Sequence, residues 1–177
     1  MGSVENVPRR FRPSFPSEWH VPNNPKLWIT WARAKAKLTR ERVCLVSSSS
    51  VEGGPHAAPV WGIWKSNRFY FETDPDSVKG RNLRSNPAVV VHIQDGFDTV
   101  IVRGRATPET DRAVLGTLLK EYARKYDYRL DRSDSRAQVV FRVEPWVAHA
   151  WRAPRMHANL LNFIFREQES SVRSQAP

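Results

Sequence analysis

A polar loop after an aromatic strand carries the side chains best suited to chemistry in this sequence. In "YFETDPDSVKGRNLRSNP", residues 70–87, Thr73 ends the strand, Ser77 follows four residues later, and Lys79 and Asn82 fall in the first turns of an expected helix. A helix N-terminus presents unpaired N–H groups and partial positive charge, and hydroxyl and ammonium groups donate to phosphate oxygens. The pattern therefore suits a bound anion. From the spacing alone a plainer interpretation is favoured, in which Ser77 only caps the helix and Lys79 extends into solvent.

The strand upstream offers flat apolar surface. In "HAAPVWGIW", residues 56–64, Pro59 lies near Trp61 and Trp64. Proline is confined to strand edges and bulges, so backbone groups near Pro59 are expected to face a ligand. A planar ring can lie against either tryptophan. Both can equally be core residues, but their opposite parity in the strand means that at most one need face the interior.

Other kinds of site find little support in the sequence. There is a single cysteine, and the five histidines show neither i, i+4 pairs nor HExxH spacing, so we expect no metal site. No serine has the glycines of a nucleophile elbow, and "GGPHAAP" lacks the Lys-Ser/Thr of a phosphate loop. His56, Tyr70 and His92 are conceivable proton partners, each more simply explained as structural. No catalytic side chain is assigned.

The elements that must position these residues are mostly strands. Five expected strands arrive within residues 42–108, mostly by hairpin connections, and one or two more follow before residue 152, broken at Pro145. Parallel strands would need long crossovers, so the sheet should be antiparallel and curled into a barrel. The predicted fold is mainly β (α+β), a six- to seven-stranded antiparallel split barrel with flanking helices.

Three helices are expected around these strands. Asn24 as N-cap and Pro25 at the first helical position predict a helix that continues to about Thr39. A short helix should follow Ser77, and a third should open near Pro108 with an apolar stripe.

Length and composition point to one domain. With 177 residues, 40% of them apolar, the chain can build a core. We expect a flexible N-terminal arm at 1–22, a cofactor-binding domain at 23–166 and a disordered tail at 167–177. There is no long apolar run and no signal-like segment, and the lone Cys44 is expected to be buried, so a cytoplasmic protein without membrane spans is predicted. The net charge of +10 attracts anions without choosing among nucleic acid, membrane and small molecules.

The order of "PHAAPVWGIW", "RFYFETDPDSVKGRNLRSNP", "AVVVHI" and "TVIVRGRAT" resembles the pyridoxamine 5'-phosphate oxidase-like split-barrel superfamily. That group includes FMN enzymes and oxidoreductases that use the deazaflavin coenzyme F-420. The resemblance covers about residues 40–107 and implies a homodimer with cofactor sites at the subunit interface. By matching position, it implies that Thr73, Ser77 and Lys79 hold the cofactor's phosphate and that Asn82 supports their loop.

The same resemblance implies roles for residues on the strands. Pro59, Val60 and Trp61 would border the isoalloxazine or deazaflavin ring. Gly104 would let its strand pass close to its neighbours. Trp151, on the closing strand, would reach the partner's site.

The sequence also departs from true pyridoxamine phosphate oxidases. They carry an Arg-Lys pair after the loop serine, where this chain has Val78 and Lys79, and Arg155 and His157 have the spacing but not the surroundings of their substrate-binding Arg-x-His. Oxidation of vitamin B6 is therefore not expected. "WGIW" and "VKGRNL" look more like the deazaflavin branch, and a basic groove would suit the polyglutamate tail of F-420.

The leading hypothesis is a homodimeric oxidoreductase that uses FMN or F-420 to transfer hydride to a small molecule that the sequence does not identify. The alternative is a non-catalytic carrier or sensor module that binds flavin or haem, since fold does not decide function. Nucleic-acid binding through "RRFR" and "RAKAKLTRER" is less expected, because the aromatic residues nearby lie on an apolar helix stripe.

Overall fold

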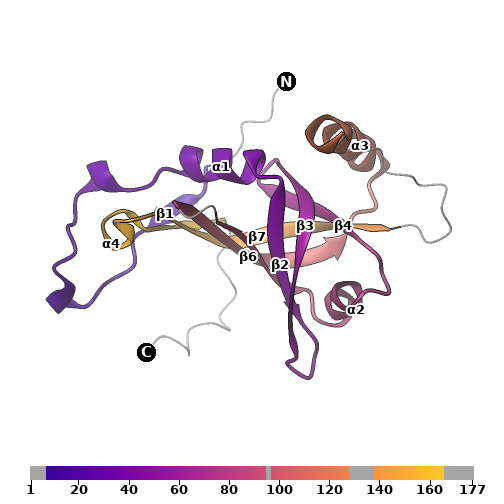
Figure 1. Cartoon of the computed structure of the whole chain (residues 1–177), viewed down its shortest axis with the longest axis horizontal. Helices are drawn as coiled ribbons and strands as arrows, with labels where there is room; N and C mark the ends of the chain where they lie inside the picture. Colours follow the sequence, from indigo (N-terminus) through magenta and orange to yellow (C-terminus); the bar gives the residue numbers. More distant parts are fainter. Residues whose placement is uncertain (1–6, 95–96, 128–137, 166–177) are drawn as a thin grey trace.

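The fold is an antiparallel barrel with helices at its ends and sides, as the computed structural model of the chain shows (Figure 1). The structure describes residues 7–94, 97–127 and 138–165. The expected tail at 167–177 lies outside the described residues, as do parts of the expected arm, of the turn at 95–98 and of the charged connection at 126–136.

Eight strands and six helical segments make up the described chain. The strands are β1 (Arg9–Phe11), β2 (Val43–Ser49), β3 (Pro55–Lys65), β4 (Arg68–Thr73), β5 (Ala88–Gln94), β6 (Asp98–Pro108), β7 (Val139–Arg152) and β8 (Leu161–Ile164). The α-helices are α1 (Trp31–Arg40), α2 (Val78–Ser85), α3 (Arg112–Tyr126) and α4 (Met156–Asn159), and the 3-10 helices are η1 (Ser17–Trp19) and η2 (Pro25–Leu27).

The strands form one sheet in the order β1-β8-β7-β4-β3-β2-β5-β6, and a further pairing of β7 with β6 closes six of them into a barrel. All pairings are antiparallel. Both the fold class and the barrel predicted from hairpin connections are thus confirmed. The two outer strands, β8 and β1, extend the sheet beyond β7.

One seam of the barrel is open for part of its length. β3 pairs with β4 only from Gly62↔Phe71 to Lys65↔Arg68, although β3 begins seven residues earlier and β4 continues to Thr73. Beyond that point β3 pairs with β2, and β4 pairs with β7. The two strands therefore diverge, and we call the opening between them the split.

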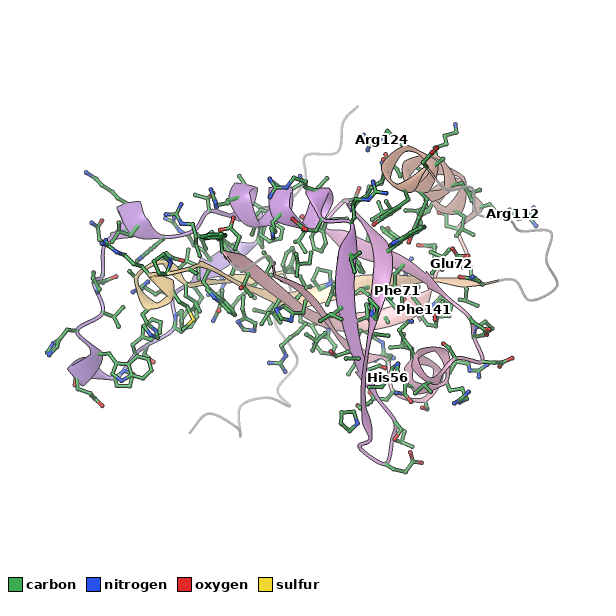
Figure 2. The ribbon with its side chains drawn as sticks, viewed as in Figure 1. His56, Phe71, Glu72, Arg112, Arg124 and Phe141 are labelled. Carbon is green, nitrogen blue, oxygen red and sulfur yellow. The ribbon has the colours of Figure 1, made fainter. Side chains whose placement is uncertain are left out.

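Two apolar clusters hold these elements. The larger fills the barrel and contains the phenylalanines of β4 and β7, Phe69, Phe71 and Phe141. The smaller lies between the sheet and α3 and contains Tyr70 together with Tyr122 and Tyr126. Alternation along β4 explains the division, because successive side chains of a strand point to opposite faces. In Figure 2, Glu72 lies toward α3, whereas Phe71 and Phe141 lie on the other side of the strand.

The first predicted helix begins later than expected. Asn24 does accept a hydrogen bond from the Lys26 N–H, but it caps only the short 3-10 helix η2. The chain is extended at Trp28, and α1 starts after Thr30, whose hydroxyl accepts from the Arg33 N–H at 3.2 Å. The expectation of one continuous helix over 24–39 was wrong.

The predicted break at Pro145 is a bulge within a continuous β7. The register with β6 shifts between Arg103↔Val147 and Gly104↔Pro145, which leaves Trp146 as the extra residue. A Cβ atom on Gly104 would lie 2.4 Å from the Glu144 carbonyl oxygen, so only glycine allows this approach. The close passage expected at Gly104 is confirmed.

Candidate functional site

A cavity of about 480 Å³ lies in the split between β3 and β4. β3 supplies one wall and β4 the other, α2 and α3 contribute one side chain each, and α2 and α3 lie on either side of β4 (Figure 1). The lining residues are Val43, Pro59, Val60, Trp61, Glu72, Lys79, Tyr122 and Gln138. Four of the residues predicted from the sequence, Pro59, Val60, Trp61 and Lys79, therefore meet at one place.

The loop before α2 is built around the Ser77 hydroxyl. It accepts a hydrogen bond from the Gly80 N–H at 3.0 Å, donates to the Asp74 carbonyl at 2.7 Å, and lies 3.1 Å from the Thr73 hydroxyl. Ser77 is thus the N-cap of α2, as the plainer interpretation required. Neither Thr73 nor Ser77 lines the cavity, but both belong to the turn that places Lys79 there.

Gly80 allows this loop to fold back on the helix. A Cβ atom at this position would lie 2.4 Å from the Asp74 carbonyl oxygen and 2.6 Å from that of Pro75. Such contacts are shorter than any side chain tolerates, so the turn requires glycine. A glycine within the first turn of a predicted helix is the sequence signal for such a tight turn.

Lys79 departs from the solvated interpretation. The residue is only 8% exposed, and no hydrogen-bond or ion-pair partner for its ammonium group occurs within residues 7–94, 97–127 and 138–165. Burial lowers the pKa of Lys79, because the charged form loses hydration. A buried amine that opens into a cavity is a group to which an anion can bind.

The two tryptophans of β3 divide as their parity predicted. Trp64 is 5% exposed in the barrel core, whereas Trp61 is 44% exposed and lines the cavity. The Trp61 indole stacks on the Tyr126 ring with centroids 4.8 Å apart and an interplanar angle of 5°. Pro59 lies where β3 has lost β4 as a neighbour, as expected of a strand proline at an edge.

Two predicted site residues lie elsewhere. Asn82 is buried and donates to the Ser48 hydroxyl at 3.2 Å, which ties α2 to β2. Trp151 pairs with Thr99 near the end of β7 and does not line the cavity. A contribution of Trp151 to a partner's site stays a prediction.

Sequence reasoning missed four lining residues, Val43, Glu72, Tyr122 and Gln138. Glu72 had a usable signal, because it shares strand parity with Tyr70 and must face the same layer. Tyr122 belongs to the apolar stripe of the third predicted helix, and a stripe indicates burial but not a place in a cavity. None of the candidate proton partners, His56, Tyr70 and His92, lines the cavity.

Two absences apply to the described part of the chain. Its helices include none that is long and apolar enough to cross a membrane. No three His, Cys, Asp or Glu side chains among residues 7–94, 97–127 and 138–165 gather into a metal site.

The chain is similar to known proteins both in a family model and in solved structures. Residues 30–152 match the family model described as pyridoxamine 5'-phosphate oxidase. No curated protein was found to match the chain. Many solved structures share the fold at low sequence identity.

Three of these structures illustrate the range of the fold. A conserved hypothetical protein from Mycobacterium tuberculosis aligns with a TM-score of 0.62 at 17% identity, over 88% of this chain and 100% of that one. An F420 reductase aligns with a TM-score of 0.54 at 22% identity, over 64% and 94%. HutZ, the haem storage protein from Vibrio cholerae, aligns with a TM-score of 0.53 at 12% identity, over 64% and 86%.

Proposed function

Because the chain belongs to the pyridoxamine 5'-phosphate oxidase family, we propose that it binds FMN or coenzyme F-420 in the split and is an oxidoreductase acting on a small molecule. The bound ring would supply the hydride chemistry. The protein would hold the phosphate, orient the ring and keep water from one of its faces. The similarity to an F420 reductase supports this proposal at the level of the fold.

The observation that carries the proposal is Lys79, whose side chain is largely buried and whose ammonium group opens into the cavity. A cation that has lost part of its hydration, without a partner in the described residues, is stabilised by a ligand that compensates its charge. Phosphate is a suitable ligand, because lysine binds it as a point charge and the first N–H groups of α2 lie on the same turn. Trp61 adds a planar apolar surface at the other side of the cavity. The residues present therefore fit a ligand that combines a phosphate with a flat ring.

A carrier or sensor that binds haem is supported less well by this cavity. Haem iron is held by His, Cys, Met or Tyr side chains. The lining residues that the structure describes include no histidine, cysteine or methionine, and the tyrosine among them, Tyr122, donates its hydroxyl to the Trp61 and Tyr70 carbonyls. A flavin carrier without turnover stays the alternative, and it is separated from an enzyme by an assay for hydride transfer.

We also propose that a second copy of the chain covers the outer face of the barrel next to the cavity. The register aligns Pro59 with Leu45, Leu45 with His92, His92 with Ile101 and Ile101 with His149 across that face. The neighbouring pair is Val43↔Trp61, and Val43, Leu45 and Trp61 are 55%, 43% and 44% exposed. Exposed apolar patches of this kind mark interfaces. Because Val43, Pro59 and Trp61 also line the cavity, a partner seated here would close it.

The direct test is a fluorescence titration of ligand-free protein with FMN and with F-420. Tight binding of either cofactor is expected, with a Kd raised about 10- to 100-fold in Lys79→Ala, the loss of one charge-assisted hydrogen bond. Lys120→Ala, which removes an exposed charge from α3, is the matched control and should bind as wild type. Binding of neither cofactor below roughly 100 μM, about 5.5 kcal/mol, would refute the proposal.

A further inference from the structure

Two tyrosine hydroxyls of α3 occupy the places where β3 leaves its neighbours. The first is Tyr122, which is 1% exposed. The β3–β4 ladder ends at Gly62↔Phe71, so Trp61 and Glu72 are the next residues along the two strands. The Tyr122 hydroxyl donates to the Trp61 carbonyl at 3.2 Å and to the Tyr70 carbonyl at 3.4 Å, and it lies next to the Glu72 backbone. It stands where the next rung of that ladder would be.

The second is Tyr126, one helical turn later, on the other edge of β3. The β2–β3 ladder ends at Val43↔Trp61, so Arg42 and Gly62 come next. The Tyr126 hydroxyl accepts from the Gly62 N–H at 2.8 Å and lies within 2.9 Å of the Gly62 and Arg42 carbonyls. It too replaces a rung.

Other contacts of α3 reinforce the same point of β3. The Lys125 ammonium donates to the Gly62 carbonyl at 2.9 Å. The Arg42 guanidinium lies 5.2 Å from the Tyr126 ring centroid, and Trp61 stacks on that ring. Burial raises the pKa of Tyr126 to about 12, and burial also raises the pKa of Tyr122, so both phenols keep their protons at neutral pH.

We infer that Tyr122 and Tyr126 are positioning residues. Tyr122 holds β3 away from β4 at Trp61, Tyr126 fixes the other edge of β3 at Gly62, beyond the end of β2, and together they keep the split open as a binding cavity. Backbone groups at a strand end need partners when water is excluded. Here i, i+4 side chains of one helix supply them, so the strand can diverge without closing its ladder again. The expected effect of the two tyrosines on cofactor affinity rests on the proposed function. Their effect on the position of β3 does not.

The experiment measures amide hydrogen exchange by NMR in ligand-free protein, together with the titration of FMN and F-420. Tyr126→Phe keeps the stacked ring and removes the acceptor of the Gly62 N–H. Tyr122→Phe removes the donor to the Trp61 and Tyr70 carbonyls, next to the Glu72 N–H. The control is Tyr70→Phe, a residue of the same cluster that is 4% exposed and whose hydroxyl interacts with Arg68 of its own strand.

Each variant should accelerate exchange at its own amide by about 5- to 10-fold, the effect of one hydrogen bond, and raise the cofactor Kd by a similar factor. The control should leave both amides and the Kd unchanged. Unchanged exchange at Gly62 and Glu72, or equal effects in Tyr70→Phe, would overturn the inference, and so would altered exchange with an unaltered Kd. If wild-type protein binds neither cofactor, the proposed function fails while the exchange data still decide whether the tyrosines position β3.

Discussion

Replacing Lys79 by methionine should stabilise the ligand-free protein while it weakens cofactor binding. Methionine keeps the length and apolar stem of the side chain and removes the buried charge. Removing an uncompensated and fully buried polar group is worth about 1–3 kcal/mol in proteins. Because the Lys79 ammonium opens into the cavity, we expect the lower end of this range, about 1 kcal/mol. For a domain of this size that corresponds to a rise in melting temperature of roughly 2–4 °C.

The burial of Lys79 also predicts how the stability of the ligand-free protein changes with pH. Burial lowers the pKa of Lys79 in the folded protein below its value in the unfolded chain. At a pH between these two pKa values, the unfolded state therefore binds more protons than the folded state. Stability must then increase with pH in that window, up to the unfolded value. Below the folded pKa, both states carry the proton and the destabilisation is fully present. Lys79→Met should remove this contribution and flatten the profile on the alkaline side.

The assay is thermal unfolding with and without cofactor, at neutral and alkaline pH. At 100 times its Kd a ligand stabilises wild type by about 2.7 kcal/mol. The variant, with its Kd raised about 10- to 100-fold, should keep only about 1.4 to 0.4 kcal/mol of that gain at the same ligand concentration. A variant that is less stable than wild type without ligand would refute the reasoning, because Lys79 would then have a compensating partner in the folded protein.

Three further outcomes follow from other parts of the structure. Gly80→Ala should destabilise the protein by about 1–3 kcal/mol in thermal melts, because the added methyl group would clash with the Asp74 carbonyl. Gly116→Ala in α3 is the control: its added methyl group would meet no atom within 4 Å, so it should stabilise the protein by about 0.5–1 kcal/mol. Leu45→Arg should convert a dimer to a monomer in sedimentation or light scattering, and an unchanged mass would exclude the proposed interface. Cys44 is 1% exposed and burial raises its pKa to about 12, so it should react with thiol reagents at pH 8 only after unfolding, and rapid labelling of the native protein would contradict its burial.

The barrel could be predicted because its signals are local. Short connections between alternating apolar runs impose antiparallel neighbours, and this logic covers the β2–β3, β3–β4 and β5–β6 pairs. The pairing of β1 with β8 joins Arg9 to Ile164 across almost the whole chain, and no local pattern encodes such a contact. The start of α1 was misplaced for a related reason. Asn24 and Pro25 are true start signals, but they serve one 3-10 turn, and the apolar spacing continued past the extended Trp28.

The candidate site was predictable in part. Pro59, Trp61 and Lys79 were found from residue type and spacing, and they do line one cavity. Burial of Lys79 could not be predicted, since a lysine in the first turn of a polar helix is ordinarily solvated. The roles of Tyr122 and Tyr126 were also hidden. An apolar stripe shows that these rings face the sheet, but the place of a hydroxyl depends on where two strand ladders end.

The split and the buried lysine share one physical property, since neither is needed to complete the barrel. A closed β3–β4 ladder and an apolar side chain at position 79 would give the same fold with fewer special contacts. Instead, tyrosines from α3 replace the missing rungs, and a charge without a described partner opens into the space they preserve. Features that cost stability and converge on one cavity are best explained by what the cavity binds. This is why the stability of Lys79→Met and the exchange of the Gly62 amide, both measured without ligand, bear directly on function.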